Sequence, residues 1–269
     1  MTIKFLKFFK FVLLLLLLLN VSYFSVVFCN QFYKKDIEVK SVNMPLIQLS
    51  AQLLLHVKTK QEVQTIEKDL FNIPMNELKQ GLPNDDAKKT FWTNIYNAYY
   101  QLLYTREQKR NPEIFTEKLI PIAHTRFCLD DIEHGILRKY RWKYSLGYLE
   151  NIFESSLIKD LAVDTIDYRI HFALNCGAKS CPPIAFYQYE KINEQLDKAT
   201  RSFLLAETEI DEAKKKIRTS KILSWFRGDF GGKEGIKYIL SSVFKQDLND
   251  YTLDFKDYDW TEAMANFEE

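Results

Sequence analysis

Hydrophobic residues recur at helical spacing along most of the chain, and strand-like patterns are confined to a few short stretches. The helical pattern covers six segments, at residues 46–57, 62–71, 86–108, 130–140, 192–203 and 233–244. Strand-like patterns occupy residues 168–175, 216–220 and 252–255. Because the helices do not alternate with strands, the pattern predicts an α+β fold, a mostly helical single domain packed on a small, largely antiparallel sheet.

The segment Tyr168–Asn175 is the most informative strand prediction, because its two faces differ in chemistry. One face would carry Tyr168, Ile170, Phe172 and Leu174, and the other would carry Arg169, His171, Ala173 and Asn175. The second face presents a cation, an imidazole and an amide beside a loop that holds two cysteines, Cys176 and Cys181. A strand with only a structural role seldom carries this combination of side chains, so this segment predicts a functional site.

The chemistry at this site depends on the state of the two cysteines. In an exported protein, we expect Cys176 and Cys181 to form a disulfide that braces the loop and leaves Cys128 as a buried free thiol. If the pair is reduced, either thiol is a candidate nucleophile and His171 is its general base. The alternative for His171 is a purely structural role, in which its imidazole is held by hydrogen bonds and takes no part in chemistry.

A second group of candidates lies on the predicted helix 130–140. Asp130, His134 and Arg138 are spaced at i, i+4 and i+8 and therefore share one face, and Glu133 is adjacent. The helix carries either a surface charge ladder or an acid–imidazole–guanidinium set that lines a cleft. In the second case Glu133 and His134 join the catalytic candidates, and Arg138 with Arg169 would hold a carboxylate or phosphate of the substrate.

Two asparagines, Asn94 and Asn97, lie one turn apart on the aromatic-rich helix predicted at 86–108. Asparagine is a middling helix former, so the pair suggests buried hydrogen-bonding roles. They would orient a histidine or satisfy loop backbone, and we include both among the candidate substrate-binding residues. The spacing of Glu133, His134 and His171 matches no metal motif, so we predict neither a metal nor a cofactor.

The N-terminus resembles an export signal. Lys4, Lys7 and Lys10 precede an apolar run, and cleavage is expected before Asn30. The uncharged stretch Phe11–Phe28 is also long enough for a marginal membrane anchor, and Cys29 is an alternative lipidation site. All three interpretations place the domain outside the cytoplasm, and contact with a membrane is expected only through this segment if it is not cleaved.

The charge balance excludes a nucleic-acid partner. Residues 1–29 hold three lysines and no acid, so the remaining chain has 34 basic and 36 acidic residues. Binding to nucleic acid needs a clustered basic excess, which this chain lacks. No other partner is indicated.

Five motifs follow one another along the chain: Phe91–Ala98 (FWTNIYNA), Leu129–Arg138 (LDDIEHGILR), Tyr168–Pro183 (YRIHFALNCGAKSCPP), Asp229–Gly232 (DFGG) and Tyr258–Trp260 (YDW). Together and in this order they resemble the domain of unknown function 547 family. The family usually has serine where this chain has Cys128. No activity is established for the family, so the resemblance implies a fold and site positions but no reaction.

The predicted organisation follows from these features. Residues 1–29 form the signal or anchor, 30–84 a linker and N-terminal helical extension, 85–262 the domain that resembles the family, and 263–269 a C-terminal tail. We expect a hydrolase or acyl-transfer-type enzyme that uses His171, Glu133 and His134. The alternative is a non-catalytic binding or scaffold domain with a structural polar network and a disulfide-braced loop.

Overall fold

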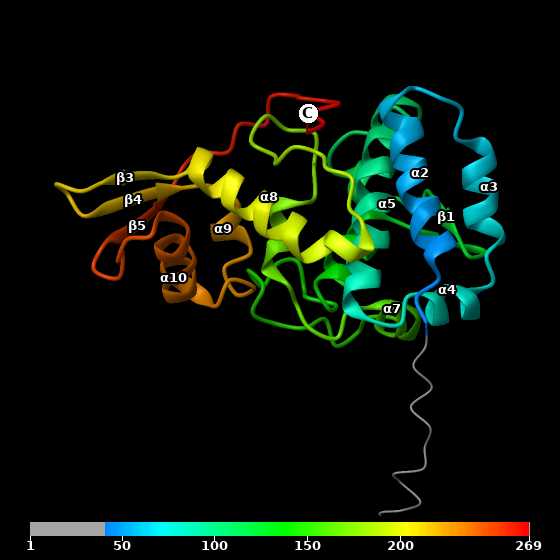
Figure 1. Cartoon of the computed structure of the whole chain (residues 1–269), viewed down its shortest axis with the longest axis horizontal. Coiled ribbons are helices and arrows are strands. Elements are labelled where there is room, and N and C mark those ends of the chain that lie inside the picture. Colours follow the sequence, from blue (N-terminus) through cyan, green and yellow to red (C-terminus); the bar gives the residue numbers. More distant parts are fainter. Residues whose placement is uncertain (1–40, 269) are drawn as a thin grey trace, which may run out of the picture. The chain divides into compact units, whose positions relative to one another are not determined.

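Helix α5 (Asp85–Thr105) is the central element of the N-terminal half in the computed structural model, which describes residues 41–268 (Figure 1). Asn84 begins the helix, because its side chain accepts a hydrogen bond from the Ala87 amide. Sixteen of the 21 residues of α5 are buried, as expected of a helix that is covered on all sides. The predicted signal, anchor and lipidation segments lie outside the described residues.

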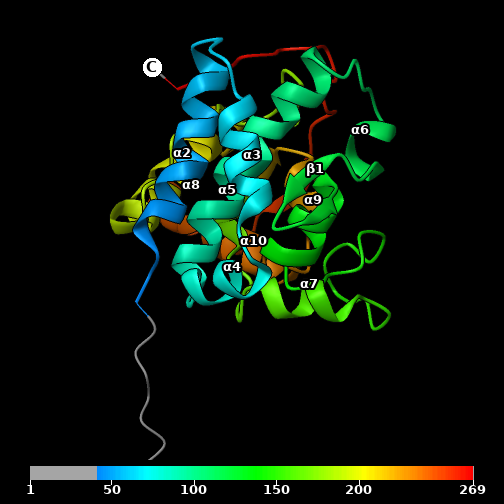
Figure 2. The same cartoon turned by 90° about the vertical axis from the view of Figure 1, so that its right-hand side faces the viewer.

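Three shorter helices precede α5 in the chain. They are α2 (Met44–Lys58), α3 (Gln64–Asn72) and α4 (Met75–Gly81), and α2 makes the main contact with α5. Figure 2 shows α2 and α3 side by side, with α5 behind them. Within residues 41–268, no helix is both long and apolar enough to cross a membrane.

The chain after α5 forms short elements that carry much of the site. These are α6 (Glu113–Thr116), the antiparallel pair β1 (Ile120–Ile122) and β2 (Thr125–Phe127), the π-helix η1 (Asp131–Leu137), α7 (Ser156–Leu161) and the 3₁₀-helix η2 (Tyr168–Phe172). The π-helix η1 packs against α7 and also contacts α5.

The C-terminal half is built on α8 (Ile192–Glu207), which contacts α5, α10 and η2 (Figure 1). The short 3₁₀-helix η3 (Tyr189–Lys191) leads into α8. A three-stranded sheet follows, with the order β3 (Glu209–Asp211), β4 (Lys216–Thr219) and β5 (Thr252–Phe255). The pairing of β3 with β4 is antiparallel and that of β4 with β5 is parallel. Helices α9 (Ile222–Trp225) and α10 (Gly232–Phe244) connect β4 to β5.

Two main clusters of buried side chains hold these elements together. The first core surrounds α5 and includes Phe91 and Trp92. The second core lies between α8, α10 and the sheet and includes Leu204 and Leu240. Segment η2 joins them, because Ile170 belongs to the first core and Phe172 to the second.

The predicted fold class, a mostly helical α+β single domain, is confirmed. The helices predicted at 46–57, 62–71, 86–108, 192–203 and 233–244 are present, as are the strands at 216–220 and 252–255. The small sheet region consists of two separate sheets rather than one. The prediction had no counterpart for the helices α4, α6, α7, η3 and α9 or for the strands β1, β2 and β3.

The strand predicted at Tyr168–Asn175 is wrong, because the segment begins as the 3₁₀-helix η2. Asp167 caps this turn by accepting a hydrogen bond from the Arg169 amide. All residues from Ile170 to Asn175 are buried. The alternating residues of the predicted strand therefore do not form one buried face and one exposed face. The backbone after η2 is hydrogen-bonded by the side chain of Asn97 rather than by a neighbouring strand.

Candidate functional site

A cavity of about 510 Å³ opens between the first and second cores. This volume lies within the range of small-molecule sites in proteins. The polar and charged residues at its wall are Tyr96, Asn111, Thr116, Asp130, Glu133, His134, Lys143 and His171. The remaining wall is apolar, aromatic or sulfur-bearing, from Pro112, Phe115, Tyr144, Leu146, Leu174, Cys176, Cys181, Pro182, Ile222, Trp225, Phe226, Tyr258 and Trp260.

The π-helix η1 positions Glu133 and His134 at the cavity. Its i→i+5 bonding is visible where the Arg138 amide donates to the Glu133 carbonyl and the Tyr140 amide donates to the Gly135 carbonyl. Gly135 permits close packing on α7, since an added Cβ would lie 2.7 Å from Ile158. Single π turns are frequent at functional sites. The helix predicted at 130–140 is therefore present, in π form.

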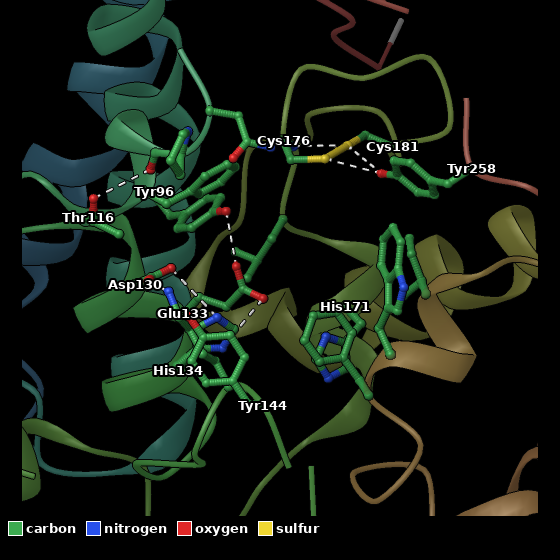
Figure 3. A pocket seen from close by; sticks show the side chains of 18 of the residues that line it. Tyr96, Thr116, Asp130, Glu133, His134, Tyr144, His171, Cys176, Cys181 and Tyr258 are labelled. Atoms are coloured by element: carbon green, nitrogen blue, oxygen red, sulfur yellow. Dashed lines mark hydrogen bonds and ion pairs between the residues drawn. A yellow bond between two sulfur atoms is a disulfide. The ribbon is translucent and has the colours of Figure 1, made fainter. Parts of the chain in front are cut away.

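Glu133 is the carboxyl with the most unusual environment. Its side chain is 13% exposed, and the exposed part faces the cavity. The Tyr96 hydroxyl donates to Glu133 Oε2 at 3.1 Å, and His134 Nδ1 lies 3.9 Å from Oε1 (Figure 3). Burial raises the pKa of Glu133 to about 7, although Arg138 opposes this rise. Glu133 can therefore exchange a proton near neutral pH.

A chain of hydrogen bonds runs from His134 beneath the cavity to His171. Arg138 Nη1 donates to His134 Nδ1 at 2.6 Å, and Arg138 Nε donates to Asp229 Oδ2 at 2.6 Å. His171 Nε2 donates to the same Asp229 oxygen at 2.8 Å. Phe226 packs on this chain, with its ring stacked 4.1 Å from His171 and 4.4 Å from the Arg138 guanidinium carbon. The Arg138 and Asp229 side chains are 1% and 0% exposed.

Both histidines are held neutral by these surroundings. Burial lowers the pKa of His134, and the nearby Arg138 charge lowers it further. Since arginine only donates, His134 Nδ1 carries no proton and its proton resides on Nε2. Burial also lowers the pKa of His171, and the Asp229 carboxylate only partly offsets this effect. For Asp229, burial works to raise the pKa, but the hydrogen bonds from His171 and Arg138 hold it below its usual value.

Asp130 and Lys143 form the outer charged pair of the cavity, at 2.7 Å. Burial raises the pKa of Asp130, and the hydrogen bond from Lys143 opposes the rise. His134 Nε2 lies 3.6 Å from Asp130 Oδ1. The i, i+4, i+8 set predicted from the sequence is thus assembled on one face, with His134 between Asp130 and Arg138.

The loop Trp142–Phe153 borders the cavity through Lys143, Tyr144 and Leu146. Among residues 41–268, seven of the twelve exposed large hydrophobic side chains lie in this loop, so this side of the cavity mouth is apolar. The loop also covers Asp229. Gly147 has φ +87°, and an added Cβ would lie 2.5 Å from Asp229 Oδ1, so only glycine fits there.

Cys176 and Cys181 form the predicted disulfide, which lies in the cavity wall (Figure 3). The Tyr258 hydroxyl lies 3.1 Å from Cys176 Sγ and 3.0 Å from Cys181 Sγ. In this bridged state neither cysteine is a nucleophile, so the structure does not support the reduced-thiol hypothesis. Cys128 is free and buried, and burial raises the pKa of its thiol to about 12, which makes it inert.

Removal of the disulfide should destabilise the protein moderately. The bridge closes a loop with a sequence separation of five residues, for which loss of chain entropy in the unfolded state is worth about 2 kcal/mol. We expect the double variant Cys176→Ala/Cys181→Ala to unfold at a lower urea concentration with an unchanged m value. Equal midpoints for the variant and the parent would show that the bridge does not constrain the unfolded chain.

Arg138 and Arg169 do not form the predicted anion clamp. Arg138 is buried beneath the cavity in its bonds to His134 and Asp229. Arg169 lies outside the cavity wall, where Asp167, Asn193 and Asp197 take its guanidinium. The sequence could not reveal that these carboxylates would satisfy Arg169.

Asn94 and Asn97 are fully buried and do not contact the cavity, so a substrate-binding role is not supported. Asn94 Nδ2 donates to the Tyr187 carbonyl and Asn94 Oδ1 accepts from the Tyr187 amide. Asn97 bonds in the same way to the Ala173 carbonyl and the Asn175 amide. The expectation that these amides satisfy loop backbone matches the structure.

Asp229, like Tyr96 and Lys143, belongs to this site although the sequence did not indicate it as a candidate. It precedes Phe230-Gly231-Gly232, a motif noted only for its resemblance to the family. The usable signal was an acid two positions before a pair of glycines, which marks a tight turn that can bring a carboxylate close to other backbone. Asp259, in the Tyr258–Trp260 motif, accepts from the Thr261 amide and pairs with Lys179. No group of three His, Cys, Asp or Glu side chains within residues 41–268 is arranged to hold a metal ion.

Comparison with known proteins adds a family but no activity. The family model described as "Protein of unknown function, DUF547" matches residues 80–204, a range that contains Glu133, His134, His171 and both bridged cysteines. Asp229 and Tyr258 lie beyond this match, so the resemblance noted there stays a prediction. Neither a curated protein nor a solved structure matches the chain. Residues 80–204 of this chain are a domain of the DUF547 family.

Proposed function

We propose that the cavity is the active site of a hydrolase or acyl-transfer-type enzyme in which Glu133 is the general base. The observation that carries this proposal is the carboxyl of Glu133, which faces the cavity with a pKa near 7. A base is most effective when its pKa lies near the working pH. Perturbed carboxyls in a concave pocket are frequent markers of catalytic sites.

The neighbouring groups support this role for Glu133. With the cysteines bridged, the nucleophile is a water or an acceptor alcohol, and Glu133 takes its proton as it attacks an acyl carbon. The Nε2–H of His134 and the ammonium of Lys143 line the same cavity and can donate to the oxygen that becomes negative. Asp229 accepts from Nε2 of His171, so Nδ1 carries no proton and is the nitrogen left to accept a hydrogen bond.

A non-catalytic binding domain is the second candidate. It is favoured by the burial of His171, whose side chain is 1% exposed, and by the asparagine amides that hold only backbone. A buried histidine and asparagine side chains bonded to backbone would also stabilise the wall of a pocket that only binds a ligand. The two candidates differ in whether Glu133 exchanges a proton with a bound substrate.

We also propose that the protein acts outside the cytoplasm, as a secreted, periplasmic or membrane-tethered protein. The sequence of residues 1–29 supports this location through its lysines and apolar run. The Cys176–Cys181 disulfide is consistent with an oxidising compartment.

Hydrolysis of a p-nitrophenyl ester and of an acyl p-nitroanilide tests the catalytic proposal. We expect kcat/KM of the parent protein to rise with pH through about 7, because Glu133 must lose its proton to act as a base. Glu133→Gln should lower kcat/KM by at least about 100-fold and abolish this pH dependence.

Glu190→Gln is the matched control, since Glu190 is exposed and outside the cavity wall. It should behave as the parent does. If the parent cleaves neither substrate, or if Glu133→Gln retains activity within about threefold of the control, the binding domain becomes the better description.

A further inference from the structure

We propose that the Cys176–Cys181 disulfide is a redox-active bond that exchanges with a low-molecular-weight thiol bound in the cavity. This inference goes beyond the proposed function and does not depend on it, because it uses neither Glu133 nor the histidines. It rests on three observations: where the two sulfurs lie, how differently they are exposed, and which hydrogen-bond donors face them.

Cys176 is the sulfur that an incoming thiol can reach. It is half-buried, whereas Cys181 is only 5% exposed. Both cysteines line the main cavity of about 510 Å³, but Cys176 also lines a second one of about 200 Å³, which is walled by Tyr100, Tyr104 and Arg110 among others. A bond that serves only to brace a loop has no need to be presented to two cavities.

Cys181 is the sulfur prepared to leave. The Cys176 amide donates to Cys181 Sγ at 3.0 Å, and this is the contact that distinguishes the two sulfurs. The Tyr258 hydroxyl lies 3.0 Å from Cys181 Sγ and 3.1 Å from Cys176 Sγ, so it can donate to Cys181 once the bond opens. Both sulfurs of a disulfide lack protons, so the Tyr258 hydroxyl is the donor. Hydrogen bonds to a charged acceptor are stronger than those to a neutral one. Both donors therefore stabilise a Cys181 thiolate more than they stabilise the intact bond.

The exchange proceeds in two balanced steps. The thiolate of the small molecule attacks Cys176 Sγ, a new S–S bond forms, and the electron pair of the old bond leaves on Cys181 Sγ. A second small-molecule thiolate then attacks the sulfur of the first small molecule in this mixed disulfide. The small disulfide forms and Cys176 is released as a thiolate. Two small thiols are oxidised to one small disulfide while the protein disulfide is reduced, and the protons of the thiols end on Cys176 and Cys181.

Glutathione is the thiol for the first experiment, applied to the folded full-length protein in buffers of graded reduced-to-oxidised ratio. Peptide mass mapping then locates each modified cysteine, which separates this site from Cys29 and Cys128. We expect reduction without unfolding and glutathione attached to Cys176. The variant Cys181→Ala, which leaves Cys176 alone, should react with oxidised glutathione at least about tenfold faster than Cys176→Ala, since Cys181 is buried.

Tyr258→Phe tests the hydrogen bond to the leaving sulfur. We expect it to need about a tenfold more reducing glutathione ratio than the parent, the factor that one hydrogen bond to a charged group contributes. Tyr238→Phe is the control, because Tyr238 is 75% exposed. Urea unfolding confirms that each variant is folded.

Three results would overturn the proposal. Reduction that occurs only in denaturant would make the bond a structural brace. Attachment of glutathione to Cys181 in preference to Cys176 would reverse the assigned roles. Equal behaviour of Tyr258→Phe and Tyr238→Phe would show that the hydroxyl does not favour the leaving thiolate.

Discussion

Replacing Arg138 by methionine is expected to lower the free energy of unfolding by about 3–5 kcal/mol. Methionine keeps most of the apolar stem but leaves the Asp229 carboxylate buried without its guanidinium partner. An uncompensated charge in a dry interior is costly, whereas loss of an exposed ion pair is not. Urea unfolding at neutral pH measures the difference from the parent protein.

The matched control is Arg218→Met, which removes a guanidinium from an exposed pair with Glu209 at 3.7 Å. We expect this change to cost less than about 1 kcal/mol. The double variant Arg138→Met/Asp229→Asn should recover part of the lost stability, because no isolated charge remains. If Arg138→Met were no worse than Arg218→Met, the buried pair would not be holding this region together.

The loss in Arg138→Met should also depend on pH. The Arg138 charge lowers the pKa of His171, so its removal lets that pKa rise. A protonated His171 can then neutralise Asp229, which it already contacts. Because a raised histidine pKa adds stability at low pH that is lost as pH rises through it, the variant should be least destabilised in mildly acidic buffer.

In the parent protein, ionisation of Glu133 is expected to lower the free energy of unfolding by about 3 kcal/mol as the pH rises, and Glu133→Gln should remove this loss. The pKa of Glu133 rises from 4.5 to about 7 in the folded protein. Between these values the unfolded chain has released the proton while the folded chain still holds it. The stability of the parent protein therefore falls as pH rises through this window. The glutamine variant lacks this titration, so its stability relative to the parent should increase by this amount between about pH 4.5 and about pH 8.

Paired urea titrations at the two pH values test this expectation, with Glu190→Gln as the exposed-carboxyl control. The control should differ from the parent by the same small amount at both pH values. A constant difference for Glu133→Gln would mean that the Glu133 carboxyl titrates normally and would also weaken its assignment as a general base.

Local patterns in the sequence were enough to place the longer helices and several residues of the cavity. The i, i+4 spacing of His134 and Arg138 predicted a contact that exists, at 2.6 Å. Glu133, His134, His171 and the two cysteines of the predicted site all line one cavity. Glu133, His134 and the two cysteines lie in segments whose helical or loop character was predicted from near neighbours. His171 lines the cavity although the secondary structure of its segment was predicted wrongly.

The errors have a common physical origin in long-range hydrogen bonding. The strand at Tyr168–Asn175 failed because Asn97, from a distant helix, took the backbone groups that a neighbouring strand would have used. Asp229 was missed because its partners Arg138 and His171 are far from it in sequence. A single sequence carries no direct signal for pairs of this kind, even when each member is visible as an unusual residue.

The π-helical form of η1 makes the length of this segment as important as its composition. Deletion of one residue between Glu133 and Leu137 would leave a segment able to form ordinary α-helical hydrogen bonds, and the backbone would remain satisfied. Side chains before the deletion would turn by about 100° relative to those after it. With Arg138 still fixed at Asp229, Glu133 would point away from Tyr96 and from the cavity. A length variant of this kind would be well folded and yet lack the carboxyl at the cavity wall.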